Sequence, residues 1–157
     1  MSEEIARLYD AYAAGLYRYA LMLLGDRALA EDAIHQVFSR MVAAASSRID
    51  RPDHYLRRAV RNECYTLLRR RRDDAVDDRP LLEPVDGASV DHDERLAIEA
   101  ALRELPVDQR EVLTLKVYEG LTFREIAEVT DAPLNTVASR YRYAIDKMRA
   151  ALDVRIR

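Results

Sequence analysis

The sequence has few of the residues that sheet-rich, disulfide-stabilised or membrane-spanning proteins need. Only four Gly and five Pro occur among 157 residues, which disfavours a sheet protein with many turns and suits a helical one. The single cysteine, Cys64, excludes an internal disulfide framework and fits a reducing compartment. No apolar run approaches the roughly 20 residues that span a bilayer. The N-terminal MSEEIARLYD is acidic where a signal peptide is basic and then apolar, so we expect a soluble cytoplasmic protein without membrane insertion.

The groups that carry enzyme chemistry are also missing from the sequence. It has no glycine-rich phosphate loop, and His35, His54 and His92 are isolated from one another. Cys64 falls on an apolar helix face, and no metal-ligand spacing occurs. We therefore expect no enzymatic activity, no metal site and no cofactor.

The charges are unevenly distributed along the chain, although the net charge is only −3. Residues 51–72 carry eight Arg against two acidic residues, whereas residues 73–94 carry nine acidic residues against one Arg. The stretch 73–92 also holds two Pro and one Gly and has no sustained periodicity, which indicates a linker.

Elsewhere, apolar residues recur at steps of three or four, the period of amphipathic helices. Helix signals flank these segments: Gly25 and Gly120 as stops, Asp26 as a cap, and a T-x-x-E capping box at Thr122 and Glu125. We expect helices over 3–24, 28–45 and 52–72 and, in the second half, over 92–105, from 106 to Gly120, from Thr122 to 129 and over 133–154. The predicted fold class is all-α, with two small helical bundles over 1–72 and 93–157 joined by a flexible acidic linker over 73–92.

The stretch TFREIAEVTDAPLNTVASRYR, residues 122–142, has the pattern of a helix-turn-helix. The turn between its helices is short enough to force a steep crossing, and Asp131 tolerates the left-handed conformation that such a turn needs. On a helical wheel Val137 faces the core, and the opposite side offers amides, hydroxyls and guanidinium groups, which read base edges and phosphates in a major groove. That outward side holds Asn135, Ser139, Arg142 and Tyr143, flanked by Thr136 and Arg140. The alternative is the solvated outer face of a helical hairpin.

The third predicted helix carries a second candidate surface, a basic stripe opposite its apolar side. Its members, within about 80° on the wheel, are Arg58, Arg61, Tyr65, Arg69 and Arg72, bordered by Tyr55, Asn62 and Thr66. Arginines interleaved with aromatic and amide groups suit a nucleic-acid backbone with stacked bases, whereas the alternative is a solvated charged face. Two interpretations of the acidic linker follow: a spacer charged for solubility, or a segment that lies on the basic stripe when DNA is absent.

These stretches together resemble the bacterial RNA polymerase sigma factors of the extracytoplasmic-function (ECF) group, over nearly the whole chain. ELPVDQREVLTLKVYEGLTFREIAEVTDAPLNTVASRYRYAIDKMRAAL is similar to sigma region four, and LYRYALMLLGDRALAEDAIHQVFSRM with YLRRAVRNECYTLLRRRR is similar to region two. The resemblance implies a non-enzymatic sigma factor that directs core RNA polymerase to specific promoters and helps to open the DNA. Region two would bind the polymerase clamp helices and the minus-ten element, and region four the minus-thirty-five element and the polymerase flap. An anti-sigma factor is a further partner that the family allows.

The resemblance also assigns roles to individual residues. Asn62 matches the region-two Asn near the melted strand, and Tyr55 stands where the family often has Trp, so its ring can stack on a base. The predicted minus-ten site is Tyr55, Arg58, Arg61, Asn62, Tyr65 and Arg69. In the helix-turn-helix, Arg124, Thr136, Ser139, Arg140 and Arg142 match family positions that face DNA, and the wheel adds Asn135 and Tyr143.

The predicted polymerase-facing segment departs from the family pattern. The family usually has Asp-Leu-Val-Gln-Glu and a Trp near its end, whereas this chain keeps Asp32, continues with AIHQ and has Val42 at the Trp position. We predict Asp32, His35 and Gln36 as polymerase-binding residues, with one negative charge fewer than the family has. Two other functions stay open: a stand-alone helix-turn-helix regulator that does not bind core polymerase, and a protein-only adaptor.

Overall fold

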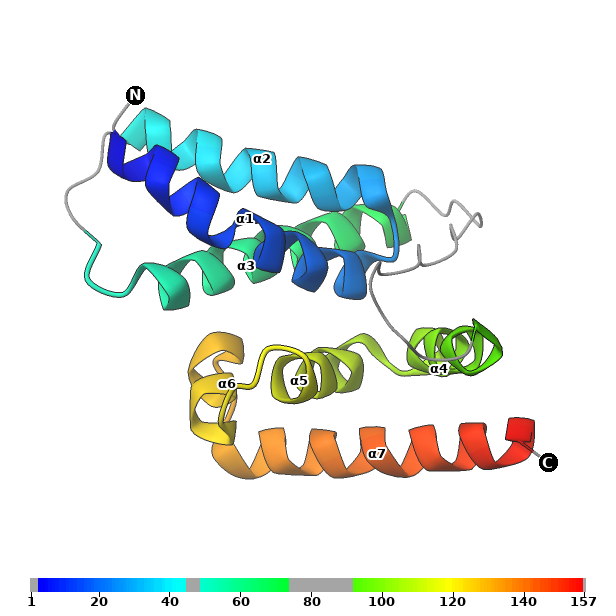
Figure 1. Cartoon of the computed structure of the whole chain (residues 1–157). Coiled ribbons are helices and arrows are strands. Elements are labelled where there is room, and N and C mark those ends of the chain that lie inside the picture. The colour runs from blue at the N-terminus through cyan, green and yellow to red at the C-terminus, as the bar shows by residue number, and fades with distance from the viewer. Residues whose placement is uncertain (1–2, 45–48, 74–91, 157) are drawn as a thin grey trace. The chain divides into compact units, whose positions relative to one another are not determined.

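Figure 1 shows the computed structural model of the chain, which describes residues 3–44, 49–73 and 92–156 and divides into two units. Within those ranges all regular secondary structure is α-helical, as the sequence predicts, and it forms seven helices. Helices α1 to α3 make the first unit and α4 to α7 the second. Of the predicted linker, Asp73 ends α3 and His92 begins α4, while the residues between them lie outside the described ranges.

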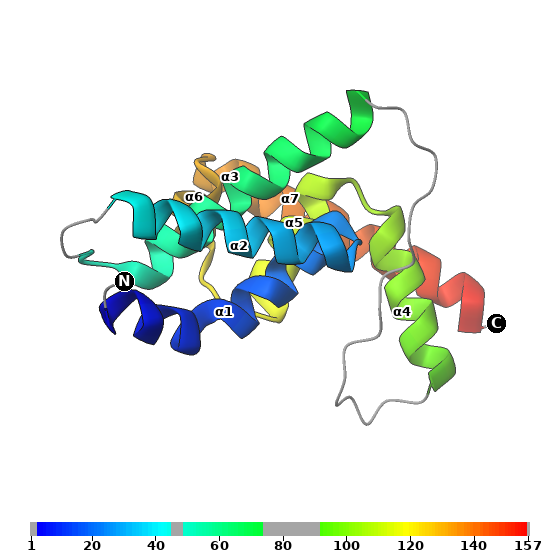
Figure 2. The ribbon, with the colours of Figure 1, turned by 90° about the horizontal axis from the view of Figure 1, so that it is seen from above.

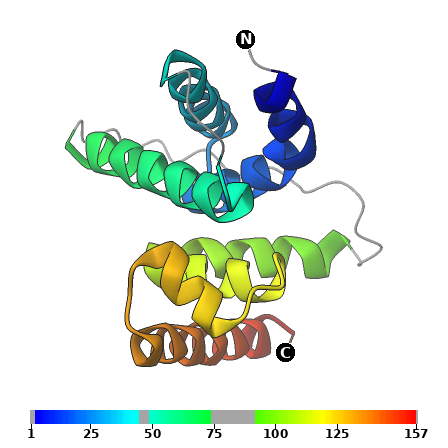
Figure 3. The ribbon, with the colours of Figure 1, turned by 90° about the vertical axis from the view of Figure 1, so that its left-hand side faces the viewer.

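The first unit is a three-helix bundle in which each helix packs against the other two. Its helices are α1 (Glu3–Leu24), α2 (Arg27–Ala44) and α3 (Pro52–Asp73), and Figure 3 shows α1 and α2 on the same side of α3. Tyr19, Leu56 and Val60 are at most 1% exposed in the core between them. Near the N-terminal end of α1, the Tyr9 ring meets the Phe38 ring of α2 edge to face, with 5.1 Å between the ring centroids.

The turn from α1 to α2 depends on two adjacent residues that the sequence marks for it. Gly25 has a φ of 67°, a conformation that costs glycine little because it has no Cβ, and its N–H donates to the Leu21 carbonyl at 2.7 Å. Asp26 Oδ1 accepts a hydrogen bond from the Leu29 N–H at 3.2 Å, which caps α2. Both predicted roles are confirmed.

The second unit is built around its longest helix, α7, which packs against the other three. Its helices are α4 (His92–Glu104), α5 (Val107–Val117), α6 (Phe123–Thr130) and α7 (Leu134–Ile156), and Figure 2 shows them from a second direction. Val112, Leu115 and Ile126 are fully buried between them. Arg110 on α5 donates to the carbonyls of Leu102 and Arg103 at 3.4 and 3.3 Å, so it ties α5 to the carbonyl end of α4.

The predicted helix bounds agree with the structure to within one turn. Helix α2 begins at Arg27 and α7 continues to Ile156, each slightly beyond its prediction. Helix α5 ends at Val117 rather than near Gly120, because the Leu121 N–H bonds the Leu115 carbonyl at 3.0 Å and closes the turn early. Across the described helices, none has an apolar stretch long enough to cross a membrane.

Candidate nucleic-acid interfaces

Helix α3 turns one side toward the core of the first unit and the other side away from it. Leu56, Val60 and Cys64, which recur every fourth residue, are fully buried. This periodicity fixes the opposite side as the basic stripe. On that side Tyr55, Asn62 and Arg69 are exposed, and Arg58, Arg61 and Tyr65 are half-buried. The structure therefore places all six residues of the predicted minus-ten site on α3, outside the core.

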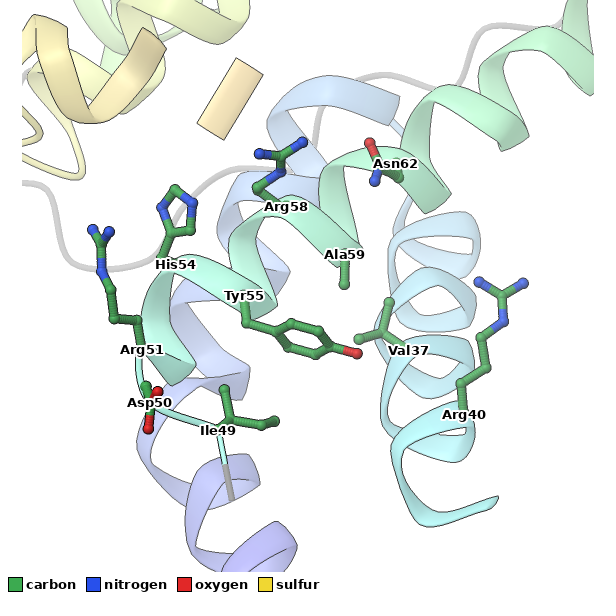
Figure 4. Close-up of a pocket in the computed structure, with 10 residues that line it drawn as sticks. All are labelled: Val37, Arg40, Ile49, Asp50, Arg51, His54, Tyr55, Arg58, Ala59 and Asn62. Atoms are coloured by element: carbon green, nitrogen blue, oxygen red, sulfur yellow. The ribbon is translucent and has the colours of Figure 1, made fainter. Parts of the chain in front are cut away.

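A pocket of about 620 Å³ lies between α2, the segment 49–51 and α3, as Figure 4 shows. Val37, Ile49 and Ala59 supply its apolar lining, and the Tyr55 ring extends across it toward Val37 (Figure 4). The polar lining consists of Arg40, Asp50, Arg51, His54, Arg58 and Asn62. The volume falls within the roughly 300–1,000 Å³ of small-ligand pockets. An apolar floor beside an aromatic ring, with a rim rich in basic groups, suits a flat base joined to phosphates.

Two of the predicted residues on α3 contact each other directly. The Arg61 guanidinium carbon lies 4.4 Å from the centroid of the Tyr65 ring, a cation–π contact. Further along the helix, Arg69 Nη2 donates to Thr66 Oγ1 at 3.1 Å. These contacts hold long side chains in place at the surface, where they present a cation and an aromatic ring together.

Arg71 belongs to the same run of arginines but faces the bundle. Its Nη1 donates to the Leu24 carbonyl at 2.8 Å, and its Nη2 lies 3.9 Å from an Asp26 carboxylate oxygen. It thereby holds the end of α3 against the turn between α1 and α2. The sequence counts Arg71 only as a positive charge, and its structural role was not predicted.

The helix-turn-helix of the second unit has the local geometry that its sequence predicts. Thr122 Oγ1 accepts from the Glu125 N–H at 3.1 Å, and Glu125 Oε1 accepts from the Thr122 N–H at 3.0 Å, which completes the capping box of α6. Asp131, the C-cap of α6, has a left-handed φ of 54°. The chain then reverses into α7, whose Val137 is fully buried, as predicted.

The outward side of this motif carries most of the residues predicted to contact DNA. Arg124, Asn135, Arg142 and Tyr143 are exposed, and Thr136, Ser139 and Arg140 are half-buried. The Arg142 guanidinium carbon lies 5.4 Å from the centroid of the Tyr143 ring. On the inner side the Tyr141 ring packs edge to face on Phe123, with centroids 5.3 Å apart, so core and surface sides of α7 are separated as the wheel predicts.

Among these residues, Arg140 forms an ion pair with another helix of the same unit. Its Nε lies 3.4 Å from an Asp108 carboxylate oxygen on α5, and its side chain is 28% exposed. The ion pair fixes the guanidinium near the start of α7, so Arg140 has less freedom to follow a ligand than Arg142 has. The sequence could not predict this pair because its partners lie on different helices.

A groove of about 1,210 Å³ runs between α1 and α2 in the first unit. Its lining includes Asp32 and His35 of the predicted polymerase-binding set, whereas Gln36 is exposed on α2 outside the lining. Tyr9 and Val42 also line the groove and are 50% and 40% exposed. An apolar groove with carboxylates on its border suits a protein segment rather than a nucleic acid. Sequence reasoning missed Tyr9, although an aromatic residue off the main apolar spacing of α1 was a usable signal.

No metal centre accompanies these surfaces in the parts of the chain that the structure describes. There, no three His, Cys, Asp or Glu side chains are grouped so that they could hold a metal ion. Cys64 is a free thiol buried on the inner side of α3.

Two sequence-family models match the chain, and they divide it as the helices do. The first, Sigma-70 region 2, matches residues 8–73, and the second, Sigma-70 region 4, matches residues 95–148. The ECF RNA polymerase sigma factor SigL of Mycobacterium tuberculosis is 30% identical over 160 residues, which cover 93% of this chain and 87% of SigL. The ECF RNA polymerase sigma factor SigK of Mycobacterium bovis is 28% identical over 160 residues, covering 95% of this chain and 86% of SigK.

The fold has a counterpart among solved structures. The sigma factor RpoE from Bartonella quintana, in a co-crystal structure with the anti-sigma factor NepR, has a TM-score of 0.81 and 22% sequence identity. The match covers 98% of this chain and 99% of RpoE. Both sigma regions match this chain, and the alignment with SigL, at 30% identity, covers most of both proteins. The chain therefore belongs to the ECF RNA polymerase sigma factors, which are non-enzymatic subunits that direct transcription initiation at specific promoters.

Proposed function

We propose that the two units of this sigma factor divide the promoter between them. The α1–α3 unit binds core RNA polymerase and the opened minus-ten element, and the α4–α7 unit binds the minus-thirty-five element as a duplex. The observation that carries this assignment is the pocket between α2 and α3, which combines an exposed aromatic ring with a basic rim (Figure 4). Such a pocket suits an unstacked base and its phosphates, whereas the regular outer side of α7 suits a major groove.

At the minus-ten site, Tyr55 is the stacking residue. Tyr55 is 47% exposed, and base–aromatic stacking contributes about 1–3 kcal/mol for each base. Asn62 can donate and accept at a base edge, because an amide carries both kinds of group. The remaining four residues, Arg58, Arg61, Tyr65 and Arg69, supply cations and a second ring along the path of the strand.

At the minus-thirty-five site, the exposed polar residues near the start of α7 read the bases. Asn135 and Arg142 have side chains that form paired hydrogen bonds with adenine and guanine edges, respectively. We assign Arg140 to a backbone phosphate, because its ion pair with Asp108 holds the side chain in place. Arg124, Thr136, Ser139 and Tyr143 complete the contact surface around these three residues.

The proposed protein partner of the first unit is core RNA polymerase, which docks on the α1–α2 side. Asp32 and His35 border the apolar groove there, and Gln36 lies on the same helix. An anti-sigma factor, the second protein partner that we propose, would have to cover this groove to keep polymerase away. Both partners and the promoter imply that the protein acts in the cytoplasm.

Run-off transcription on a library of genomic fragments tests this function. We expect core polymerase to give new, discrete transcripts only when the full chain is added. An Asp32→Arg variant should lose both these transcripts and co-purification with core polymerase, while it keeps its salt-dependent affinity for duplex DNA. DNA binding without any complex with core polymerase would instead indicate a stand-alone regulator, and the absence of salt-dependent DNA affinity would indicate an adaptor.

A further inference from the structure

An ion pair joins α2 to α3 beside the proposed minus-ten site. Arg40 Nη1 on α2 lies 3.0 Å from Glu63 Oε2 on α3. The two partners differ strongly in exposure: the Arg40 side chain is 63% exposed, whereas the Glu63 side chain is 8% exposed. Glu63 directly follows Asn62, which lines the pocket, and Arg40 lines the pocket from α2 (Figure 4).

The burial of Glu63 explains why the pair is ordered. A carboxylate that is almost withdrawn from water needs a cationic partner, because an isolated buried charge is strongly unfavourable. Arg40 supplies the charge, and Glu63 in return fixes the position of a long side chain that would otherwise sample many rotamers at the surface.

The guanidinium of Arg40 keeps donors for a second ligand. A guanidinium has five N–H donors in a planar fork, and the contact with Glu63 is made through Nη1. Within the described ranges, Arg40 pairs with Glu63 alone. Since the carboxylate is buried and the guanidinium is exposed, a ligand that approaches from solvent meets donors and positive charge rather than the acid.

We propose that Arg40 is a further DNA-binding residue of this protein, positioned by Glu63 to bind a backbone phosphate of the strand whose base enters the α2–α3 pocket. The inference rests on the proposed minus-ten site and extends it from α3 onto α2. In Figure 4 Arg40 comes from the opposite side of the pocket to Arg51 and His54. A strand that crosses the pocket would therefore meet cations on both sides of the bound base.

The test is a substitution of both partners that leaves the net charge unchanged. The double variant Arg40→Gln/Glu63→Gln removes one positive and one negative charge, and it leaves no buried carboxylate unpaired, so the bundle should fold. The probe is a fluorescein-labelled single-stranded DNA of 15 random nucleotides, titrated with the full chain at several KCl concentrations. We expect the affinity to fall about threefold or more, and the slope of log affinity against log salt to flatten by up to about 0.7, the value for one phosphate contact on a single strand.

Two control variants make the result specific. Glu4→Gln/Arg7→Gln makes the same charge-neutral change at exposed positions of α1 that line neither the α2–α3 pocket nor the α1–α2 groove. This variant should leave the DNA affinity and the salt slope unchanged. Arg58→Gln alters the proposed minus-ten site directly and should flatten the slope. Thermal melting of each variant verifies that the helices remain folded.

The possible outcomes distinguish a failure of this inference from a failure of the proposed function on which it rests. A flattened slope for Arg58→Gln with a wild-type slope for the Arg40/Glu63 double variant overturns the inference alone. Weaker binding by the double variant at an unchanged slope also overturns it, because the pair would then only shape the pocket. A wild-type slope for both variants overturns the minus-ten site on α3 together with the inference.

Discussion

Arg71 and Arg69 lie two positions apart in one run of arginines, yet they act in different ways. Arg69 is exposed on the basic stripe, whereas Arg71 donates to the Leu24 carbonyl at 2.8 Å and lies near Asp26. The Leu24 carbonyl ends α1 and has no partner within its own helix. An arginine of α3 therefore either belongs to the proposed DNA-binding stripe or stabilises the bundle, depending on the side of the helix that it occupies.

Arg71→Met should destabilise the first unit without moving the DNA site. It keeps the length of the side chain but removes a charged hydrogen bond, which contributes about 1.5–3 kcal/mol. Thermal denaturation followed by circular dichroism measures the loss. Arg72→Met is the matched control, because Arg72 is exposed and its replacement should leave the melting temperature almost unchanged. Equal melting temperatures for the two variants would contradict the structural role of Arg71.

Individual residues show where sequence reasoning succeeds and where it stops. The left-handed Asp131 and the buried Val137 were predicted correctly, because turn chemistry and helical periodicity are local properties. The ion pairs of Arg140 with Asp108 and of Arg40 with Glu63 were not, since each joins two helices whose packing a single sequence does not reveal. The predicted minus-ten and minus-thirty-five residues gather on two surfaces, and their contacts with DNA remain predictions.

At the scale of single elements, the stability of α6 depends on the residues at its two ends. It has eight residues, fewer than an isolated helix needs to be stable in water. Its first turn is closed by the capping box of Thr122 and Glu125, and its last by Asp131. These ends set the direction in which α7 leaves the turn, so the helix caps contribute directly to the geometry of the proposed DNA-binding surface.

Thr122→Ala should therefore lower the stability of the second unit. Loss of an N-cap side chain costs about 1 kcal/mol, which corresponds to roughly 4–8 °C in the melting temperature of a domain of this size. Thr122→Ser keeps a hydroxyl at the same position and should restore most of the difference. Differential scanning calorimetry of the full chain measures both variants. The cap would be unimportant if the alanine and serine variants melted together with the wild type.

The bounds of the elements could be predicted well, but the spaces between them could not. Gly25, Asp26 and the T-x-x-E box define helix ends by chemistry that acts over a few residues. The α1–α2 groove and the α2–α3 pocket arise only when helices pack at particular angles. The periodicity of the sequence therefore could not predict them. The structure was therefore needed to show that Tyr9 and Val42 are exposed residues of the groove.

At the scale of the whole molecule, the chain joins two units that each carry one proposed DNA site. Two sites on one chain reinforce each other, because binding at the first raises the effective concentration of the second at its own element. Each contact can then be weak by itself while the complete promoter is bound firmly. Variants in the two units should therefore impair different steps of initiation rather than the same step.

Arg142→Ala and Tyr55→Ala should separate these steps in the polymerase complex. Arg142→Ala removes an exposed donor of α7 and should weaken binding to the closed duplex promoter by about 1–3 kcal/mol, with less effect on a template that is already opened at the minus-ten element. Tyr55→Ala should leave duplex binding near wild type and reduce strand opening by about tenfold, since stacking contributes about 1–3 kcal/mol.

Permanganate reactivity of unpaired thymines measures opening, and gel retardation of the duplex promoter measures closed binding. Tyr55→Trp is the matched control for the first unit, because it keeps an aromatic ring at the pocket and should retain opening. Equal loss of both signals in both variants would mean that the two units do not act at separate promoter elements. Wild-type opening with Tyr55→Ala would remove Tyr55 from the minus-ten site while leaving the assignment of α7 intact.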